Sequence, residues 1–122
     1  MVQQLAPLKL AFLHLIEGQT GGARDLSDKG VAPFDYAALR AAYAGPWMVN
    51  NGYSRAMALD AVASGAADLV AIGKPFISNP DLVRRLREDA PLAKWVQATL
   101  YGGGAAGYTD YPTLESSLAA AA

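Results

Sequence analysis

The sequence predicts an α/β fold in which parallel strands alternate with helices. Three apolar runs of strand length, at residues 10–16, 46–49 and 68–72, each end at a polar or glycine-containing turn. Their apolar residues do not alternate strictly with polar ones, which is typical of strands buried on both faces of a parallel sheet. Helical patterns follow at 34–43 and 55–64. Strands and helices in this order favour right-handed crossover connections.

Capping signals predict where the later helices begin. Ser54 is a good N-cap for the helix over 55–64, and Gly65 follows its end. A third helix is predicted after 79–81, where Asn79 serves as the cap and a proline follows it. Its apolar residues are expected to face inward and its arginines to stay in solvent: Leu82, Val83 and Leu86, and Arg84, Arg85 and Arg87.

The composition indicates a folded protein without disulfides. The 122 residues are 52% hydrophobic and 17% charged, which excludes a disordered chain. The net charge is -1 with no basic stripe, so neither nucleic acid nor a membrane surface is an expected partner. Because there is no cysteine and the longest apolar run cannot span a bilayer, a cytoplasmic protein is expected.

The two tryptophans, Trp47 and Trp95, are interpreted as packing residues.

Two turns at the ends of predicted strands form a candidate anion site. Asn51 and Gly52 follow the second strand, and Gly73 and Lys74 follow the third. Backbone amides and an ammonium group at the carboxyl ends of neighbouring strands can cradle a phosphate. The same residues also suit ordinary turns with a solvated lysine, so their spacing alone leaves both interpretations open.

The segment around the end of the first strand holds the other candidates. His14, the only histidine, lies inside an apolar run and is predicted to be a hydrogen-bonded core residue. Glu17 could shape a site or bind Arg24 or a backbone amide, and the second interpretation is favoured. The polar loop 18–28 follows the carboxyl end of this strand, where barrel enzymes carry their active-site loops.

The most specific feature is the stretch 100–112, which holds four glycines and three tyrosines in thirteen residues. Such a composition fits neither a helix nor a strand. Together with the segment 73–82, it resembles the C-terminal part of the old yellow enzyme family, which are flavin-dependent ene-reductases. The resemblance covers residues from about 5 to about 114. It implies that residues 1–122 form the last three βα units of a TIM (β/α)8 barrel, incomplete on their own.

This resemblance implies a role for the two turns. In the family, the phosphate of flavin mononucleotide (FMN) sits on backbone amides of these turns and on a basic side chain. By similarity, Asn51, Gly52, Gly73 and Lys74 would take those positions. Arginine is the commoner family residue where this chain has Lys74, and a lysine keeps the charge but loses the bidentate geometry.

The resemblance also implies roles beside the flavin ring. Tyr101 would lie against the dimethylbenzene edge of the flavin and border the substrate mouth, although Leu100 replaces one of the family's two aromatic residues. Thr20 would border the substrate pocket from the loop after the first strand. Tyr108 and Tyr111 are interpreted as packing the loop onto the barrel.

The function implied by the resemblance is that of an FMN-dependent oxidoreductase. Reduced by NAD(P)H, it would transfer hydride to an activated alkene, either an α,β-unsaturated carbonyl or a nitro compound. The family's catalytic residues fall outside this chain, so no catalytic residue and no metal ligand is assigned. A second chain carrying the first five barrel strands is the expected partner, and the isolated chain is expected to be inactive. The alternative is a non-catalytic barrel fragment or assembly module without a cofactor.

Overall fold

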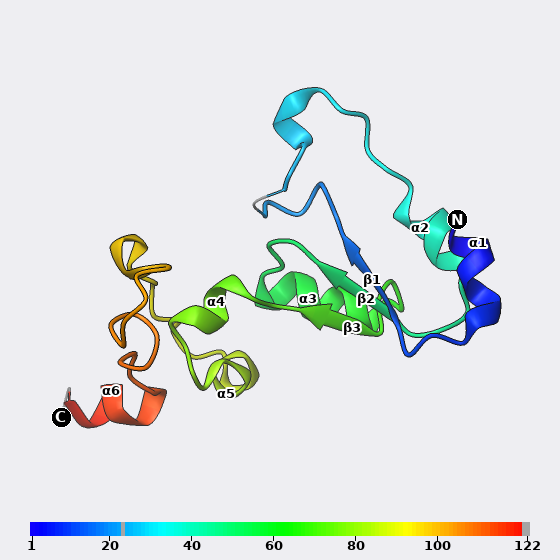
Figure 1. Cartoon of the computed structure of the whole chain (residues 1–122). Helices are drawn as coiled ribbons and strands as arrows, with labels where there is room; N and C mark the ends of the chain where they lie inside the picture. The colour runs from blue at the N-terminus through cyan, green and yellow to red at the C-terminus, as the bar shows by residue number, and fades with distance from the viewer. Residues whose placement is uncertain (23, 121–122) are drawn as a thin grey trace. The chain divides into compact units, whose positions relative to one another are not determined.

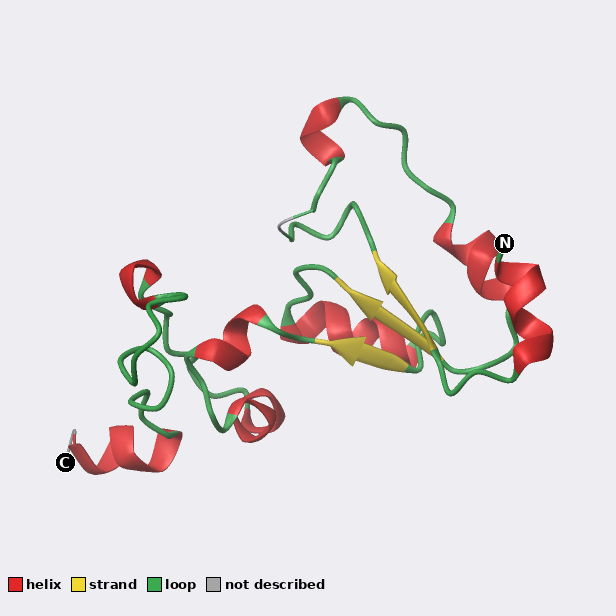
Figure 2. Cartoon of the chain, in the orientation of Figure 1, coloured by secondary structure: helices red, strands yellow, loops and turns green. Residues whose placement is uncertain are grey.

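The computed structural model describes residues 1–22 and 24–120. The chain forms two compact units, Met1–Ile72 and Gly73–Ala122 (Figure 1). The first unit carries a parallel sheet, and the second consists of short helices and loops (Figure 2). Within the described residues, no helix is long and apolar enough to cross a membrane.

The three predicted strands are present and pair in parallel, in the order β1-β2-β3. They are β1 (Leu13–Ile16), β2 (Trp47–Asn50) and β3 (Leu69–Ala71), shorter or slightly shifted relative to the apolar runs. β2 is the central strand, so β1 and β3 each present an unpaired edge within the described sheet. The helices of this unit are α1 (Val2–Leu5), η1 (Ala6–Leu8), η2 (Ser27–Lys29), α2 (Tyr36–Ala41) and α3 (Arg55–Ala63).

Side-chain caps determine where α2 and α3 begin. The Ser54 hydroxyl accepts a hydrogen bond from the Met57 amide at 3.2 Å, which confirms the predicted cap of α3. The Asp35 carboxylate accepts one from the Ala38 amide at 2.9 Å. Because this cap fixes the first turn, α2 begins two residues later than the apolar pattern predicted.

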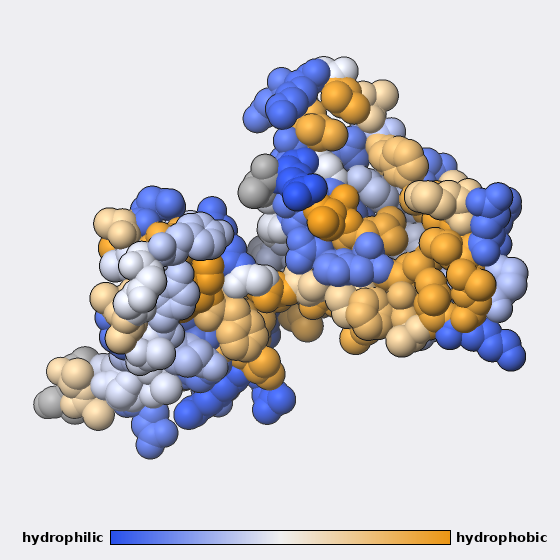
Figure 3. All heavy atoms as spheres, viewed as in Figure 1, coloured by the Kyte–Doolittle hydropathy of each residue, from blue (hydrophilic) through white to orange (hydrophobic). Residues whose placement is uncertain are grey.

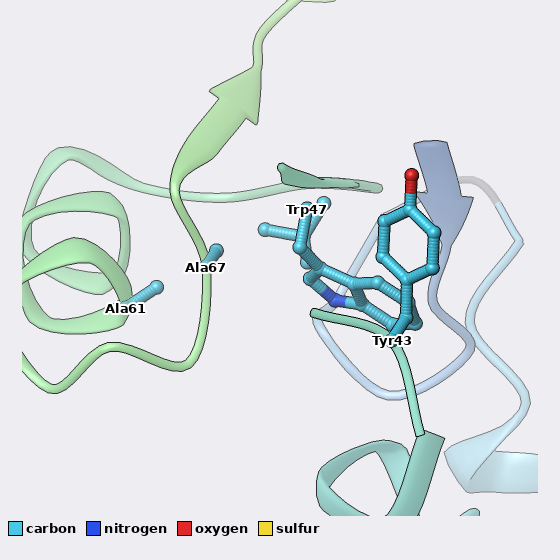
Figure 4. Packing of buried hydrophobic residues seen from close by; sticks show 5 residues of the cluster. Tyr43, Trp47, Ala61 and Ala67 are labelled. Carbon is cyan, nitrogen blue, oxygen red and sulfur yellow. The ribbon is translucent and has the colours of Figure 1, made fainter. Parts of the chain in front are cut away.

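The hydrophobic core lies between one face of the sheet and α3. Trp47 and Val49 of β2 are buried there, together with Ala61 of α3 and Ala67 just before β3 (Figure 4). The ring of Tyr43 lies beside that of Trp47, with their centroids 6.1 Å apart. The interpretation of Trp47 as a packing residue is therefore confirmed.

Among the described residues of the first unit, no helix lies over the other face of the sheet (Figure 2). Register places His14 opposite Met48 and Ile16 opposite Asn50 on this face, and both β1 side chains are exposed. The prediction of a core position for His14 is therefore wrong, because only the alternate residues of β1 face the core. Large apolar side chains lie on the surface of both units (Figure 3).

The second unit is held together by a buried arginine. It contains α4 (Lys74–Ile77), α5 (Leu82–Glu88), η3 (Gln97–Thr99) and α6 (Leu114–Ala120). Arg85 is 4% exposed and donates hydrogen bonds to the Asp81 carboxylate, 2.7 Å, and to the carbonyls of Pro91, 2.7 Å, and Pro112, 3.1 Å. The same carboxylate accepts a hydrogen bond from the Leu114 amide at 2.7 Å. The prediction of a solvated Arg85 is wrong, because later carbonyls satisfy its donors.

Asn79 and Val83 also differ from the sequence prediction. Asn79 is buried and exchanges hydrogen bonds with the backbone of Ala93, so it ties down the segment after α5 rather than capping the helix. Asp81 occupies the N-cap position of α5. Val83 is exposed rather than inward-facing, while Leu82 is fully buried as predicted.

Candidate functional site

The turn after β2 has left-handed backbone at two successive residues. Asn51 has φ 108° and Gly52 has φ 86°. Asparagine and glycine are residues that tolerate this region, so the sequence suits the turn. Asn50 pairs with Ala71, which means that the carboxyl ends of β2 and β3 lie next to each other in the sheet. The turn leads directly into α3 behind its Ser54 cap.

Asn51 is bound on several sides by the loop that follows β1. Its side-chain amide donates a hydrogen bond to the Glu17 carbonyl, and its side-chain oxygen accepts one from the Arg24 amide at 3.2 Å. The Asn51 carbonyl accepts a hydrogen bond from the Thr20 hydroxyl. Asn51 is only 6% exposed. The predicted substrate-pocket residue Thr20 and the predicted phosphate-turn residue Asn51 are therefore in direct contact.

The backbones of the loop and the turn approach so closely that they meet at two glycines. A Cβ atom placed on Gly22 would overlap Asn51, and one placed on Gly52 would overlap the backbone of Gly22. A side chain at either position would therefore force the loop and the turn apart. The contact requires glycine on both sides.

Glu17 and Tyr53 form a hydrogen bond beside this contact. The Tyr53 hydroxyl donates to a carboxylate oxygen of Glu17, which is 7% exposed. Burial raises the pKa of Tyr53 above its ordinary value of 10.0, and the hydrogen bond and negative charge of Glu17 raise it further. The favoured interpretation of Glu17, a bond to Arg24 or a backbone amide, is not what its carboxylate does. Tyr53 was missed because it lies 36 residues away and no local pattern links the two.

In the second unit, the turn after β3 places Gly73 and Lys74 at the start of α4. A Cβ atom on Gly73 would meet no atom within 4 Å, so its backbone is open to approach. The Lys74 ammonium lies 4.2 Å from the centre of the Trp95 ring. Trp95 therefore holds a cation as well as packing, which its interpretation as a packing residue did not include.

The glycine- and tyrosine-rich loop is organised by tyrosine hydroxyls. The Tyr101 amide donates to the Tyr108 hydroxyl at 2.9 Å, and the Val96 amide donates to the Tyr111 hydroxyl at 2.8 Å. Tyr108 and Tyr111 thus hold the loop itself. Tyr101 has φ 62° and is 93% exposed, so its ring is free to contact another molecule.

The first unit offers the backbone amide of Gly52, and the second unit offers that of Gly73 and the ammonium group of Lys74. Donors of this kind suit a phosphate. Among the residues described, no cluster of three or more histidine, aspartate or glutamate side chains could hold a metal ion.

Parallel strands with intervening helices, and with glycine-containing turns at the strand ends, define an α/β protein, the class to which barrel enzymes belong. No family model matches the chain. Similar curated proteins include 12-oxophytodienoate reductase 7 of Oryza sativa subsp. japonica, 43% identical over 113 residues, which cover 87% of this chain and 28% of the relative. Another is 12-oxophytodienoate reductase 2 of Arabidopsis thaliana, 36% identical over 118 residues, which cover 96% of this chain and 31% of the relative.

Solved structures give the same result. The old yellow enzyme homologue from Zymomonas mobilis is similar with a TM-score of 0.82 and 40% identity, over 93% of this chain and 31% of that one. The old yellow enzyme from Trypanosoma cruzi has a TM-score of 0.79 and 35% identity, over 93% of this chain and 28% of that one. The chain therefore belongs to the old yellow enzyme family, and it spans about a third of the length of these relatives.

Proposed function

We propose that this chain is the C-terminal, FMN-phosphate-binding segment of an ene-reductase barrel, comprising its last three βα units. The observation that carries the proposal is the parallel pairing of Asn50 with Ala71. This pairing means that the glycine-containing turns 51–52 and 73–74 start from adjacent strand ends. Neighbouring strand ends are where barrel enzymes commonly bind phosphate.

The proposed phosphate ligands are the backbone amides of Asn51, Gly52 and Gly73 and the ammonium of Lys74. The fit rests on the donor set, because these groups bring positive charge and N–H donors. Left-handed backbone at the first turn and open backbone at Gly73 support it. Lys74 would supply the charge that the family's arginine supplies elsewhere, with one ammonium in place of a guanidinium fork.

The chemistry that FMN supplies when bound is hydride transfer, received from NAD(P)H and delivered to an electron-poor alkene such as an α,β-unsaturated carbonyl or nitro compound. This chain would contribute orientation. Tyr101 would border the flavin ring and the substrate mouth, and Thr20 would border the substrate pocket. The exposure of the Tyr101 ring supports its part. The residues that polarise the substrate and donate a proton would come from outside this chain.

The first five strands are proposed to come from a second chain. The unpaired edges of β1 and β3 and the sheet face that carries His14 and Ile16 support this proposal. In a closed barrel, α3 would remain outside while the uncovered face would line the packed interior. The isolated chain is accordingly proposed to be inactive.

Co-expression tests this function. The chain would be produced alone, and with the part of the Zymomonas mobilis homologue that carries the strands missing here. FMN would then be added and each sample desalted. Retention of flavin absorbance only in the co-expressed sample is the expected result. A folded assembly that retains no flavin would contradict the proposal and favour the alternative, a barrel fragment or assembly module without a cofactor.

A further inference from the structure

We propose that Asn51 is a positioning residue whose side chain fixes the loop after β1, while its backbone remains available to the cofactor phosphate. The loop concerned is residues 17–26, except residue 23, and is called the β1 loop below. The proposal rests on the function proposed above, because it assigns the two halves of Asn51 to the substrate side and the phosphate side of the same site.

The hydrogen bonds of Asn51 carry this proposal. Its side chain binds the Glu17 carbonyl at the start of the β1 loop and the Arg24 amide near the end. The Asn51 carbonyl accepts a hydrogen bond from the hydroxyl of Thr20, which lies between Glu17 and Arg24 in the sequence. One residue of the β2 turn thus holds the β1 loop at three places. The loop has an internal bond as well, from the Leu26 amide to the Gly18 carbonyl at 2.6 Å, which closes it into one piece.

The side chain of Asn51 is directed into the β1 loop. It is buried, its amide group donates a hydrogen bond to the Glu17 carbonyl, and its oxygen accepts one from the Arg24 amide. An oxygen atom would in any case repel a phosphate rather than bind it. The backbone amide of Asn51 is therefore the part that can serve the cofactor.

The backbone conformation at position 51 helps to explain why the residue there is asparagine and not glycine. With φ 108°, this position would suit glycine without any steric cost. Asparagine gains the contacts to the β1 loop and tolerates the left-handed region better than most residues. Gly22 lies directly against Asn51, and a Cβ atom on Gly22 would overlap it. These features indicate that the side chain is used to hold the loop rather than to shape the turn.

Separate effects on substrate and cofactor follow from this division. Removal of the side chain frees the β1 loop, which carries the proposed pocket residue Thr20. The turn keeps its backbone, because glycine accepts the same φ. Substrate binding is therefore expected to weaken, whereas cofactor binding is not.

The test uses Asn51→Gly with Asn50→Ala as the matched control. Asn50 is the preceding asparagine, and its side chain binds the Ala71 carbonyl at 2.8 Å instead of the β1 loop. In the assembled enzyme, Asn51→Gly is expected to raise KM for the alkene about fivefold, with FMN affinity changed less than about twofold. Equal losses of substrate and FMN binding, or an unchanged KM, would overturn the proposal.

Hydrogen exchange of the Arg24 amide in the full chain gives a second readout that needs no activity. Asn51→Gly is expected to speed this exchange about fivefold, since the amide loses its acceptor. Thr20→Val, which leaves Asn51 in place, should speed it less, and Asn50→Ala should not change it. Unchanged exchange in Asn51→Gly would overturn the proposal even if FMN is bound. Faster exchange without any flavin retention in the wild-type assembly would instead contradict the proposed function alone.

Discussion

The ammonium nitrogen of Lys74 lies 4.2 Å from the centre of the Trp95 ring. A cation–π contact at an exposed site is worth about 0.5–1 kcal/mol. A hydrogen bond between charged groups is worth about 1.5–3 kcal/mol. If a phosphate lies within reach, the Lys74 ammonium is therefore expected to bind the phosphate in preference to the Trp95 ring. The contact with Trp95 keeps the lysine ordered without preventing its proposed use.

Lys74→Ala is expected to weaken FMN binding by the assembled enzyme about tenfold, which corresponds to the loss of one charge-assisted contact of about 1.5 kcal/mol. Lys74→Arg should bind FMN at least as well as the wild type, because it restores a bidentate donor. Quenching of flavin fluorescence on titration measures both. Lys94→Ala is the control, since Lys94 is an exposed lysine of the same unit outside the proposed site. An FMN affinity unchanged by Lys74→Ala would remove Lys74 from the phosphate site.

Tyr101→Ala is expected to change the visible absorption spectrum of the bound flavin with little effect on stability. The Tyr101 side chain is exposed, and surface substitutions usually alter the free energy of unfolding by less than about 0.5 kcal/mol. Tyr108→Phe is the comparison, because it removes the hydroxyl that holds the Tyr101 amide but leaves the Tyr101 ring. Identical flavin spectra in wild type and Tyr101→Ala would show that this ring does not contact the flavin.

Tyr53→Phe is expected to lower the free energy of unfolding by about 1–2 kcal/mol near neutral pH, because the buried Glu17 carboxylate loses its donor. The pKa of Tyr53 is raised in the folded state, so its stabilising contribution is fully present below its ordinary pKa of 10.0. The contribution is lost as pH rises above that value, because Tyr53 then ionises in the unfolded chain but stays protonated in the folded one. The difference between wild type and variant should therefore shrink at alkaline pH.

Urea unfolding of the assembled enzyme and its Tyr53→Phe variant, at about pH 8 and at about pH 11, measures this difference. Glu17→Gln is a useful companion, since it removes the negative charge that helps to raise the pKa of Tyr53. A wild-type advantage that grows with pH would contradict the assigned direction of the shift.

Gly22→Ala is expected to destabilise the protein by about 1–3 kcal/mol, because the added methyl would overlap Asn51. Gly104→Ala is the matched control: a Cβ atom there would meet no atom within 4 Å, and its backbone is not left-handed. The two variants differ by the same methyl group, so thermal unfolding compares the sites directly. Equal unfolding temperatures for both variants would contradict the close approach of the β1 loop to the β2 turn.

Local patterns in the sequence predicted the elements that local interactions determine. The strands around Trp47 and Val70 and the Ser54 cap were predicted because apolar runs and caps act over a few residues. The bond between Glu17 and Tyr53 was not, since its partners are 36 residues apart in the sequence. Burial of Arg85 was missed for the same reason, because it depends on the distant carbonyl of Pro112.

The candidate site likewise has features that the local sequence predicted and features that it did not. Left-handed backbone at the turn 51–52 agrees with the residues that suggested a turn there. The contact between Thr20 and Asn51 could not be predicted, since nothing in the sequence indicates that the first loop folds back over the second turn. His14 was placed in the core because its neighbours are apolar, and the alternation of side chains along β1 sends it to the other face.

The most direct test of the account is the structure of the assembled enzyme with FMN bound. We expect phosphate oxygens within about 2.7–3.2 Å of the amide nitrogens of both Gly52 and Gly73, with the Lys74 ammonium among the remaining donors. A phosphate bound elsewhere in the barrel, or these two glycines facing away from each other, would contradict the central claim.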